Sequence, residues 1–318
     1  MDLIAKFQRS WKLFATSVRI TFSQPKLLLF PVVSGVCTCV IILFFVMPVL
    51  LPLIIRDTGY HFYQAEHWTT LSNHYFHGSQ SGPAPRVANL PFRLEGAILP
   101  LWWAGLYLVS MFLATFFNVA FYSEIIAALN GKPVSLTRGL GLATSRLQSI
   151  LIWALFAGLV GLIIRKIEQQ FSFLGRIVAG LIGTAWSVAA VFVIPVIIQE
   201  EPTVNPVKLL KQSALTLRKT WGEALIGYLG LSGGSSLVGW ASVILLLVAG
   251  GLALLLQSVW FFVGAVILWL FGMVGLAYVT NVASQVYRCA LYLYAAEGVV
   301  PEPYSPELMD MAWKVKKN

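Results

Sequence analysis

The sequence predicts an all-α polytopic membrane protein with about six transmembrane helices in three hairpins, each preceded by a cytoplasmic amphipathic helix. One observation behind this is a run of 64 residues between Glu223 and Arg288 without Lys, Arg, Asp, Glu or His. At about 1.5 Å per residue, this run holds two helices across a ~30 Å hydrocarbon core, with a turn at Gln257-Ser258. The second observation is composition: 58% of the 318 residues are hydrophobic and 11% are charged, which excludes a soluble globular domain.

Four further spans follow from the same absence of charge, and the sequence predicts one integral membrane domain over residues 1–318. The predicted spans are 27–55, 97–123, 147–164, 177–198, 224–256 and 259–287. The third span is short, because Arg165, Lys166 and Glu168 interrupt it. The segment 147–198 therefore either crosses with snorkelling ends or is re-entrant, and the sequence leaves both open.

The distribution of positive charge predicts the orientation. Of the 22 Lys and Arg residues, 16 lie in 1–26, 124–146, 199–223 and 288–318, and 6 lie in the alternate loops. The positive-inside rule therefore places both termini and the tail 288–318 in the cytoplasm, and the loop 56–96 outside. We expect a multi-pass protein of the bacterial inner membrane, and membrane lipids rather than nucleic acid explain the net charge of +9.

Three basic segments have helical spacing of apolar residues and precede the span pairs. In residues 1–26 the expected membrane-interface side chains are Phe7, Trp11, Phe14, Lys12 and Arg19. The second segment follows Pro133 and has the apolar stripe Leu136, Leu140, Ala143, Leu147 and Ile150. The third follows the cap-like pair Asn205-Pro206, and its predicted apolar stripe is Leu210, Ala214, Leu217 and Trp221.

Two patterns resemble chemical sites but favour structural interpretations. Gly230-Leu231-Ser232-Gly233-Gly234 spells G-x-S-x-G, yet no His follows His77 to serve as a base, so we expect no enzyme activity. We interpret Gly230 and Gly234, like Ala179 and Gly183, as surfaces for close helix packing. The four His residues, at 61, 67, 74 and 77, all lie in the loop 56–96, where we expect neither a metal site nor a bound cofactor.

The polar residues of the spans are neutral, apart from one acid at the inner end of the second span. Pore-lining candidates are Ser110, Thr115, Asn118, Glu124, Thr184, Ser187 and Asn281. Interhelical hydrogen bonding is the alternative use of such residues. Ion-coupled carriers need ionisable groups within the bilayer, and the predicted spans have none, so coupled transport is not expected.

Several short motifs resemble an uncharacterised bacterial family of six-helix membrane proteins. The matching segments are Ser10–Leu13 with Lys26–Pro31, Leu174–Gly180, Lys211–Ala214 with Arg218–Glu223, and Cys289–Gly298. This resemblance implies a topology and no activity. The amphipathic helix that leads into Leu- and Pro-rich half-spans is also loosely similar in architecture to CysZ-like sulfate permeases, an analogy of fold alone.

Two functions remain open from the sequence. The first is a passive channel or facilitator for a small polar or anionic solute, formed between neutral helix faces or at a subunit interface. The alternative is a non-transporting membrane scaffold that binds lipids or a partner protein. We expect membrane lipids as partners and no nucleic acid, and a homo-oligomer and a small solute stay open.

Overall fold

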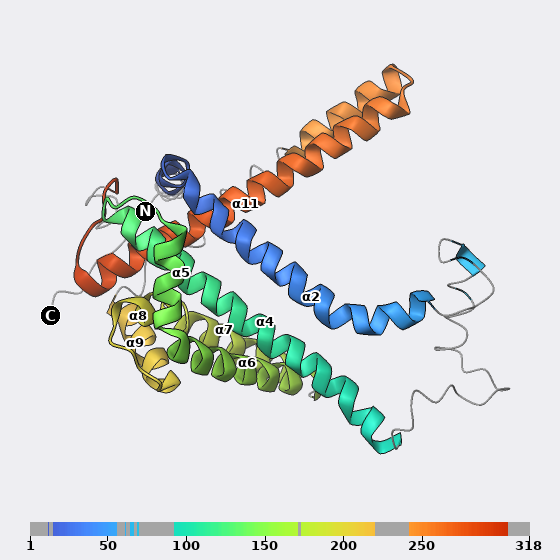
Figure 1. Cartoon of the computed structure of the whole chain (residues 1–318). Helices are drawn as coiled ribbons and strands as arrows, with labels where there is room; N and C mark the ends of the chain where they lie inside the picture. The colour runs from blue at the N-terminus through green and yellow to red at the C-terminus, as the bar shows by residue number, and fades with distance from the viewer. Residues whose placement is uncertain are drawn as a thin grey trace. The chain divides into compact units, whose positions relative to one another are not determined.

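The structure is a computed structural model, and it describes residue 12 and residues 15–55, 61, 64–66, 69, 92–170, 173–219 and 242–304. Within this part of the chain the regular elements are helical (Figure 1). They are η1 (Pro25–Leu28), α2 (Leu29–Ile55), α4 (Phe92–Leu129), α5 (Leu136–Ser145), α6 (Leu147–Gln170), α7 (Phe173–Ala189), α8 (Val193–Gln199), α9 (Pro206–Lys219) and α11 (Val259–Glu297). Residues 15–23 and Ser242–Leu255 are helical as well.

Among the residues that the structure describes, five helices are long and apolar enough to cross a membrane. These candidate spans are Pro25–Met47, Leu101–Leu129, Leu147–Gln170, Gly175–Gln199 and Val259–Glu297. The predicted span 224–256 falls mostly outside the described residues, which contain its last part as the shorter apolar helix Ser242–Leu255. An all-helical protein with several membrane-length helices is therefore confirmed. The charges after Ile164 do not end the third helix, because α6 continues through them to Gln170.

The chain divides into two compact units, of which the smaller comprises residues Val33–Leu113. It contains most of α2 and the first part of α4. The indole nitrogen of Trp102 donates a hydrogen bond of 2.9 Å to the carbonyl oxygen of Phe45, and the two rings lie 4.9 Å apart. Gly105 lies against the same phenyl ring, 3.7 Å from where a β-carbon would stand. These contacts pair the two helices within this unit.

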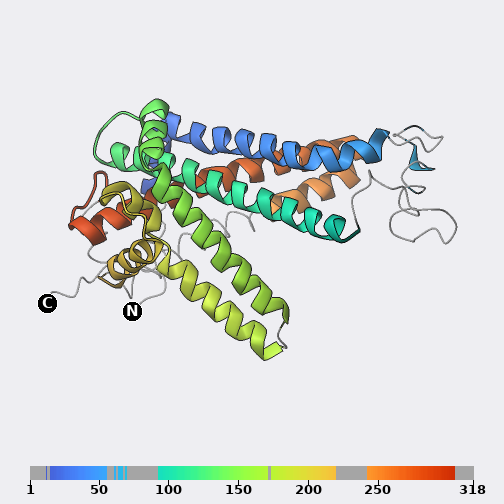
Figure 2. The same ribbon diagram turned by 60° about the horizontal axis from the view of Figure 1, so that its bottom comes forward.

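The larger unit comprises Met1–Val32 and Ala114–Asn318, and two helical hairpins lie in its described residues. In the first, α6 and α7 run side by side in both views (Figures 1 and 2). The rings of Trp153 and Trp186 stack at 5.9 Å across this hairpin. In the second, the helix Ser242–Leu255 is followed by a turn, and α11 then runs back along it. Gln257 in this turn has a φ of 49°, and Ser258 caps α11. The indole of Trp269 donates to the Ser242 hydroxyl at 3.1 Å and ties this hairpin together.

The buried core of the larger unit lies where the helices meet, away from the hairpin tips. We call this region the hub: residues 15–30, the C-terminal ends of α4 and α11, the N-terminal end of α6, and α5, α8 and α9. Its fully buried side chains include Leu27, Ile125, Ile150, Phe192, Leu209, Tyr287 and Leu293. Phe30 stacks on Phe121 at 5.4 Å. The long hairpins instead expose large apolar side chains along their length, as helices bathed in lipid do.

Candidate functional site

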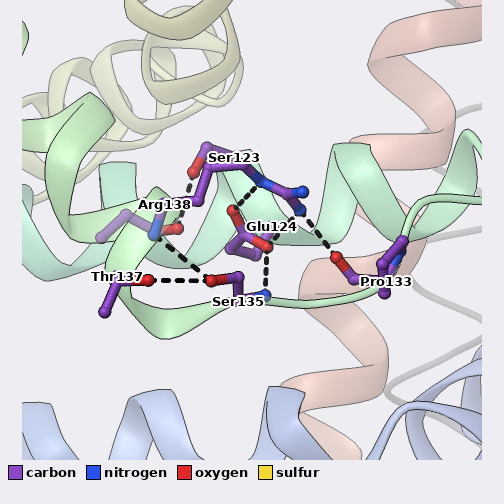
Figure 3. A network of polar contacts seen from close by, with 7 residues as sticks. Ser123, Glu124, Pro133, Ser135, Thr137 and Arg138 are labelled. Atoms are coloured by element: carbon purple, nitrogen blue, oxygen red, sulfur yellow. Dashed lines mark hydrogen bonds and ion pairs between the residues drawn. The ribbon is translucent and has the colours of Figure 1, made fainter.

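The densest polar network in the hub joins the end of α4 to the start of α5 (Figure 3). The carboxylate of Glu124 on α4 is 1% exposed and accepts three hydrogen bonds. Arg138 donates two of them, from Nε at 2.8 Å and from Nη2 at 2.6 Å, and the backbone N–H of Ser135 donates the third at 2.7 Å. The guanidinium also donates to the carbonyl oxygen of Pro133 at 2.9 Å. This bidentate geometry is the strong form of the arginine–carboxylate pair.

The local sequence explains why these groups meet. Gly131 has a φ of 72°, which glycine adopts at no steric cost, and it turns the chain after α4. Ser135 then caps α5, its hydroxyl accepting from the N–H of Arg138 at 3.5 Å. The carboxylate of Glu124 completes the cap, because it accepts a hydrogen bond from the backbone N–H of Ser135. The hydrogen bond to Glu124 raises the pKa of Arg138, so the guanidinium stays charged throughout the physiological range.

A glycine lets α5 approach this closely. A β-carbon on Gly139 would stand 2.7 Å from the carbonyl oxygen of Ala120 and 2.9 Å from Cγ of Glu124. Both distances are shorter than real β-carbon contacts, and the nearer atom belongs to the backbone of α4. Gly139 is therefore a close-packing glycine between α5 and α4. By contrast, a β-carbon on Gly141 of the same helix would have no neighbouring atom within 4 Å.

A second polar contact satisfies backbone groups at the break between α7 and α8. Proline has no N–H and clashes with the carbonyl four residues earlier, so Pro195 ends the regular helix, and residues 190–192 form a turn. The hydroxyl of Ser213 on α9 donates to the carbonyl oxygen of Ala189 at 2.6 Å and accepts from the N–H of Phe192 at 3.0 Å. Ser213 is fully buried. One side chain thus satisfies both backbone groups at the break and attaches α9 to it.

Other contacts join distant parts of the chain in the hub. The hydroxyls of Ser17 and Tyr304 lie 2.7 Å apart and both residues are buried, so the ends of the described chain meet. Burial raises the pKa of Tyr304, which stays protonated and able to donate this bond. Arg288 donates to the Tyr122 hydroxyl at 3.1 Å, and Arg146 donates to the carbonyl oxygen of Ile198 at 3.4 Å.

The predicted pore-lining residues have different local environments in the structure. Glu124 is buried in its ion pair, and Thr115 is also buried. The hydroxyls of Thr184 and Ser187 donate to carbonyl oxygens of their own helix, at 2.8 Å each, although both residues are exposed. Asn118 and Asn281 are exposed, and Ser110 belongs to the other unit. Pore lining stays a prediction for these residues.

The predicted packing and interface residues have mixed placements. Ala179 is buried, and a β-carbon on Gly183 would meet the side chain of Ile164 at 3.6 Å, an ordinary contact. Lys12 and Arg19 are exposed. The remaining residues of both predictions lie outside the described part of the chain: Gly230, Gly234, Phe7, Trp11 and Phe14.

Sequence reasoning missed the residues that hold the hub together. Ser213 looks like a polar position on a basic helix, and the glycine at 139 has no motif around it. A signal existed for one of them, since a proline at 195 inside an apolar run predicts a helix break that needs a partner. Within the described residues, no group of three or more His, Cys, Asp and Glu side chains is placed to hold a metal ion.

The comparison with known protein families matches more than half of the chain and gives no activity. No curated protein and no solved structure matches, so the architectural likeness to CysZ-like sulfate permeases gains no support from them. Residues 100–301 match a family described as Family of unknown function (DUF6159), and this range contains α5 to α9 and the rest of the hub's helices from α4 onward. The resemblance to a family without an established activity is therefore confirmed: the chain belongs to the Family of unknown function (DUF6159).

Proposed function

We propose that this protein is a non-transporting membrane scaffold, in which six membrane-spanning helices anchor the hub on the cytoplasmic face of the inner membrane. Both termini lie on that face, and the basic helices ahead of the hairpins lie in its interface. The hub is the working part, and it binds lipids or a partner protein. The distribution of charge supports this orientation, because 16 of the 22 Lys and Arg residues lie in 1–26, 124–146, 199–223 and 288–318, the segments that include or adjoin those of the hub.

One observation carries the choice of a scaffold over a channel. Glu124 is the acid expected at the inner mouth of a pore, and in the structure its carboxylate is buried and taken up by Arg138 and Ser135. A carboxylate in that state offers no site to a passing ion. The polar groups of the hairpins are used in the same way: Thr184 and Ser187 bond their own helix, and Ser242 receives a bond across its hairpin. Hydrogen bonds of this kind stabilise individual helices and the packing between them.

Flux measurements test the proposal. Purified full-length protein in sealed vesicles should give no more release of potassium, chloride, sulfate or small neutral solutes than vesicles without protein. Orientation and protein content are measured on the same vesicles, so that failed insertion cannot imitate a negative result. Reproducible protein-dependent flux of any of these solutes would refute the scaffold.

A passive facilitator is the second candidate, and a specific observation favours it. Asn118, Thr184, Ser187 and Asn281 are exposed within membrane-length helices, where a second copy of the chain would be needed to cover them. A pore would then form between copies. Under this alternative, solute flux would appear together with a stable oligomer, and exchange of Thr184 and Ser187 for Val would reduce both.

A further inference from the structure

The outward face of α9 alternates positive and apolar side chains, and it differs from the face expected from the sequence. Leu209 and Ser213 are buried against the hub, whereas the predicted apolar stripe of Leu210, Ala214 and Leu217 is half-buried. Val207, Lys211, Leu215 and Arg218 follow one another at steps of four, four and three residues and therefore share the opposite face. Lys208 lies beside them. All five are exposed, with Val207 at 58% and Leu215 at 48%.

We propose that this face of α9 is a docking surface for the anionic headgroups of the membrane leaflet beside it. The proposal rests on the scaffold function and names its ligand as an acidic phospholipid. Valine and leucine side chains would enter the boundary of the acyl region while the lysine and arginine side chains extend to the phosphates, as in interfacial helices.

Position and charge favour a lipid surface as the occupant. Six residues lie between the end of the candidate span Gly175–Gln199 and Pro206, and such a linker reaches at most about 25 Å, so α9 starts close to the membrane surface. The helix contains no Asp or Glu, and the acids in the preceding linker are Glu200 and Glu201. Asn205 fixes where the helix begins, since its side-chain oxygen accepts from the N–H groups of Val207 and Lys208 at 3.0 and 3.1 Å.

The attachment of α9 to the hub holds this face in one orientation. Ser213 binds the α7–α8 break from the opposite side of the helix, so α9 cannot roll without breaking two buried hydrogen bonds. Rotation would also expose Leu209. The binding face is thus preorganised. The conformational entropy needed to order it is lost when the protein folds and not when it binds lipid.

The test uses the full chain with a probe on this face. Cys37 and Cys39 are replaced by Ala, buried Cys289 is kept, and a bimane label is placed on Leu215→Cys. The protein is reconstituted in nanodiscs of phosphatidylcholine, or of phosphatidylcholine with one third phosphatidylglycerol. Quenching by acrylamide, a neutral reagent, reports how much water the label meets. Absence of reaction at Cys289 verifies that the hub is folded in each variant.

We expect phosphatidylglycerol to lower the quenching constant at least threefold, and 0.5 M salt to reverse most of that change. The triple variant Lys208→Gln, Lys211→Gln and Arg218→Gln should lose this response to phosphatidylglycerol. Each cation is expected to raise the preference for acidic lipid about fivefold, so removal of all three should lower it roughly a hundredfold. A matched control removes three exposed cations at the other end of the α6–α7 hairpin: Arg165→Gln, Lys166→Gln and Arg176→Gln. This control should respond like the parent.

Three results would overturn the inference. A label equally quenched in both lipids would show that the face meets water. A label equally shielded in both would show that the cover of this face does not depend on acidic headgroups. Loss of the response in the control variant would reduce the effect to overall charge. Flux through vesicles of the same lipids would refute the scaffold function while leaving the lipid response intact, so the two proposals fail separately.

Discussion

The two members of the Glu124–Arg138 pair are unequally exposed, and their removal should therefore cost unequal amounts of stability. Glu124 is 1% exposed, whereas the Arg138 side chain is 44% exposed. In Arg138→Gln the buried carboxylate of Glu124 keeps its hydrogen bond from the N–H of Ser135 but loses its ion pair with the guanidinium. In Glu124→Gln the guanidinium can turn to water, and the new amide oxygen can still accept from Ser135.

The expected costs follow from this difference. Removing one partner and leaving the other buried and charged costs about 3 kcal/mol. Removing the buried partner loses charge-assisted hydrogen bonds, but the exposed arginine regains solvent, so the cost falls to about 1 kcal/mol. The variants should therefore differ by about 2 kcal/mol, with Arg138→Gln the less stable. At about 2 to 4 °C per kcal/mol, this corresponds to a difference of roughly 4 to 8 °C in the unfolding midpoint.

Cys289 provides a reporter for this measurement, because it is fully buried in the hub. With Cys37 and Cys39 replaced by Ala, a thiol dye that fluoresces on reaction reports the temperature at which the hub opens in detergent. The midpoint is an operational stability, so all variants are heated at the same rate. Arg165→Gln, which removes an exposed cation on α6, should lie within about 0.5 kcal/mol of the parent.

Equal midpoints for Glu124→Gln and Arg138→Gln, or a lower midpoint for the glutamate variant, would refute the reasoning. Either result would mean that Glu124 is solvated in the folded protein. That outcome would return this acid to the list of candidates for a pore mouth.

Three further predictions concern the same region and its orientation. Gly139→Ala should lower the unfolding midpoint by an amount equivalent to about 1 to 3 kcal/mol, while Gly141→Ala should leave it unchanged or raise it, because only the first β-carbon meets backbone. Ser213→Ala should cost about 1 to 3 kcal/mol in the same assay through the two backbone groups left unpaired, and full retention of the midpoint would show that water replaces the hydroxyl. Impermeant thiol reagents added to sealed cells should label Gln169→Cys and miss Glu201→Cys, both at exposed positions, and labelling of the second alone would invert the proposed topology.

The spans and their caps could be predicted from the sequence because both depend on local properties. A run without charge is readable as membrane-length helix wherever it folds, and the structure has such helices at five of the predicted places. The predicted cap pair Asn205-Pro206 begins α9, since a capping side chain needs only the next few residues, and α11 follows the predicted turn at Gln257-Ser258. Even α6, which runs past Arg165 to Gln170, departs from the prediction only in its end.

The polar contacts of the hub could not be predicted, because their partners are distant in the chain. Nothing near Ser213 in the sequence says that a helix break lies opposite, and nothing near Tyr304 points to Ser17. For the same reason, the buried face of α9 differs from the predicted apolar stripe. Which face of a short helix is buried depends on what the helix packs against. Helical periodicity gives the spacing of a face and leaves its partner undetermined.

These contacts share a physical cause, which also says where the protein should be sensitive to change. A regular helix satisfies its own backbone in lipid, whereas each turn, break and helix end releases N–H and C=O groups that need partners. Glu124 serves the turn between α4 and α5, and Ser213 serves the break between α7 and α8. Among the described residues, these two buried polar side chains thus lie where helices end, and the hairpins mostly expose apolar side chains. A scaffold needs this arrangement, because it must hold one surface rigid while its anchors adjust to lipid. A conducting pore would instead need its specific polar residues along the spans.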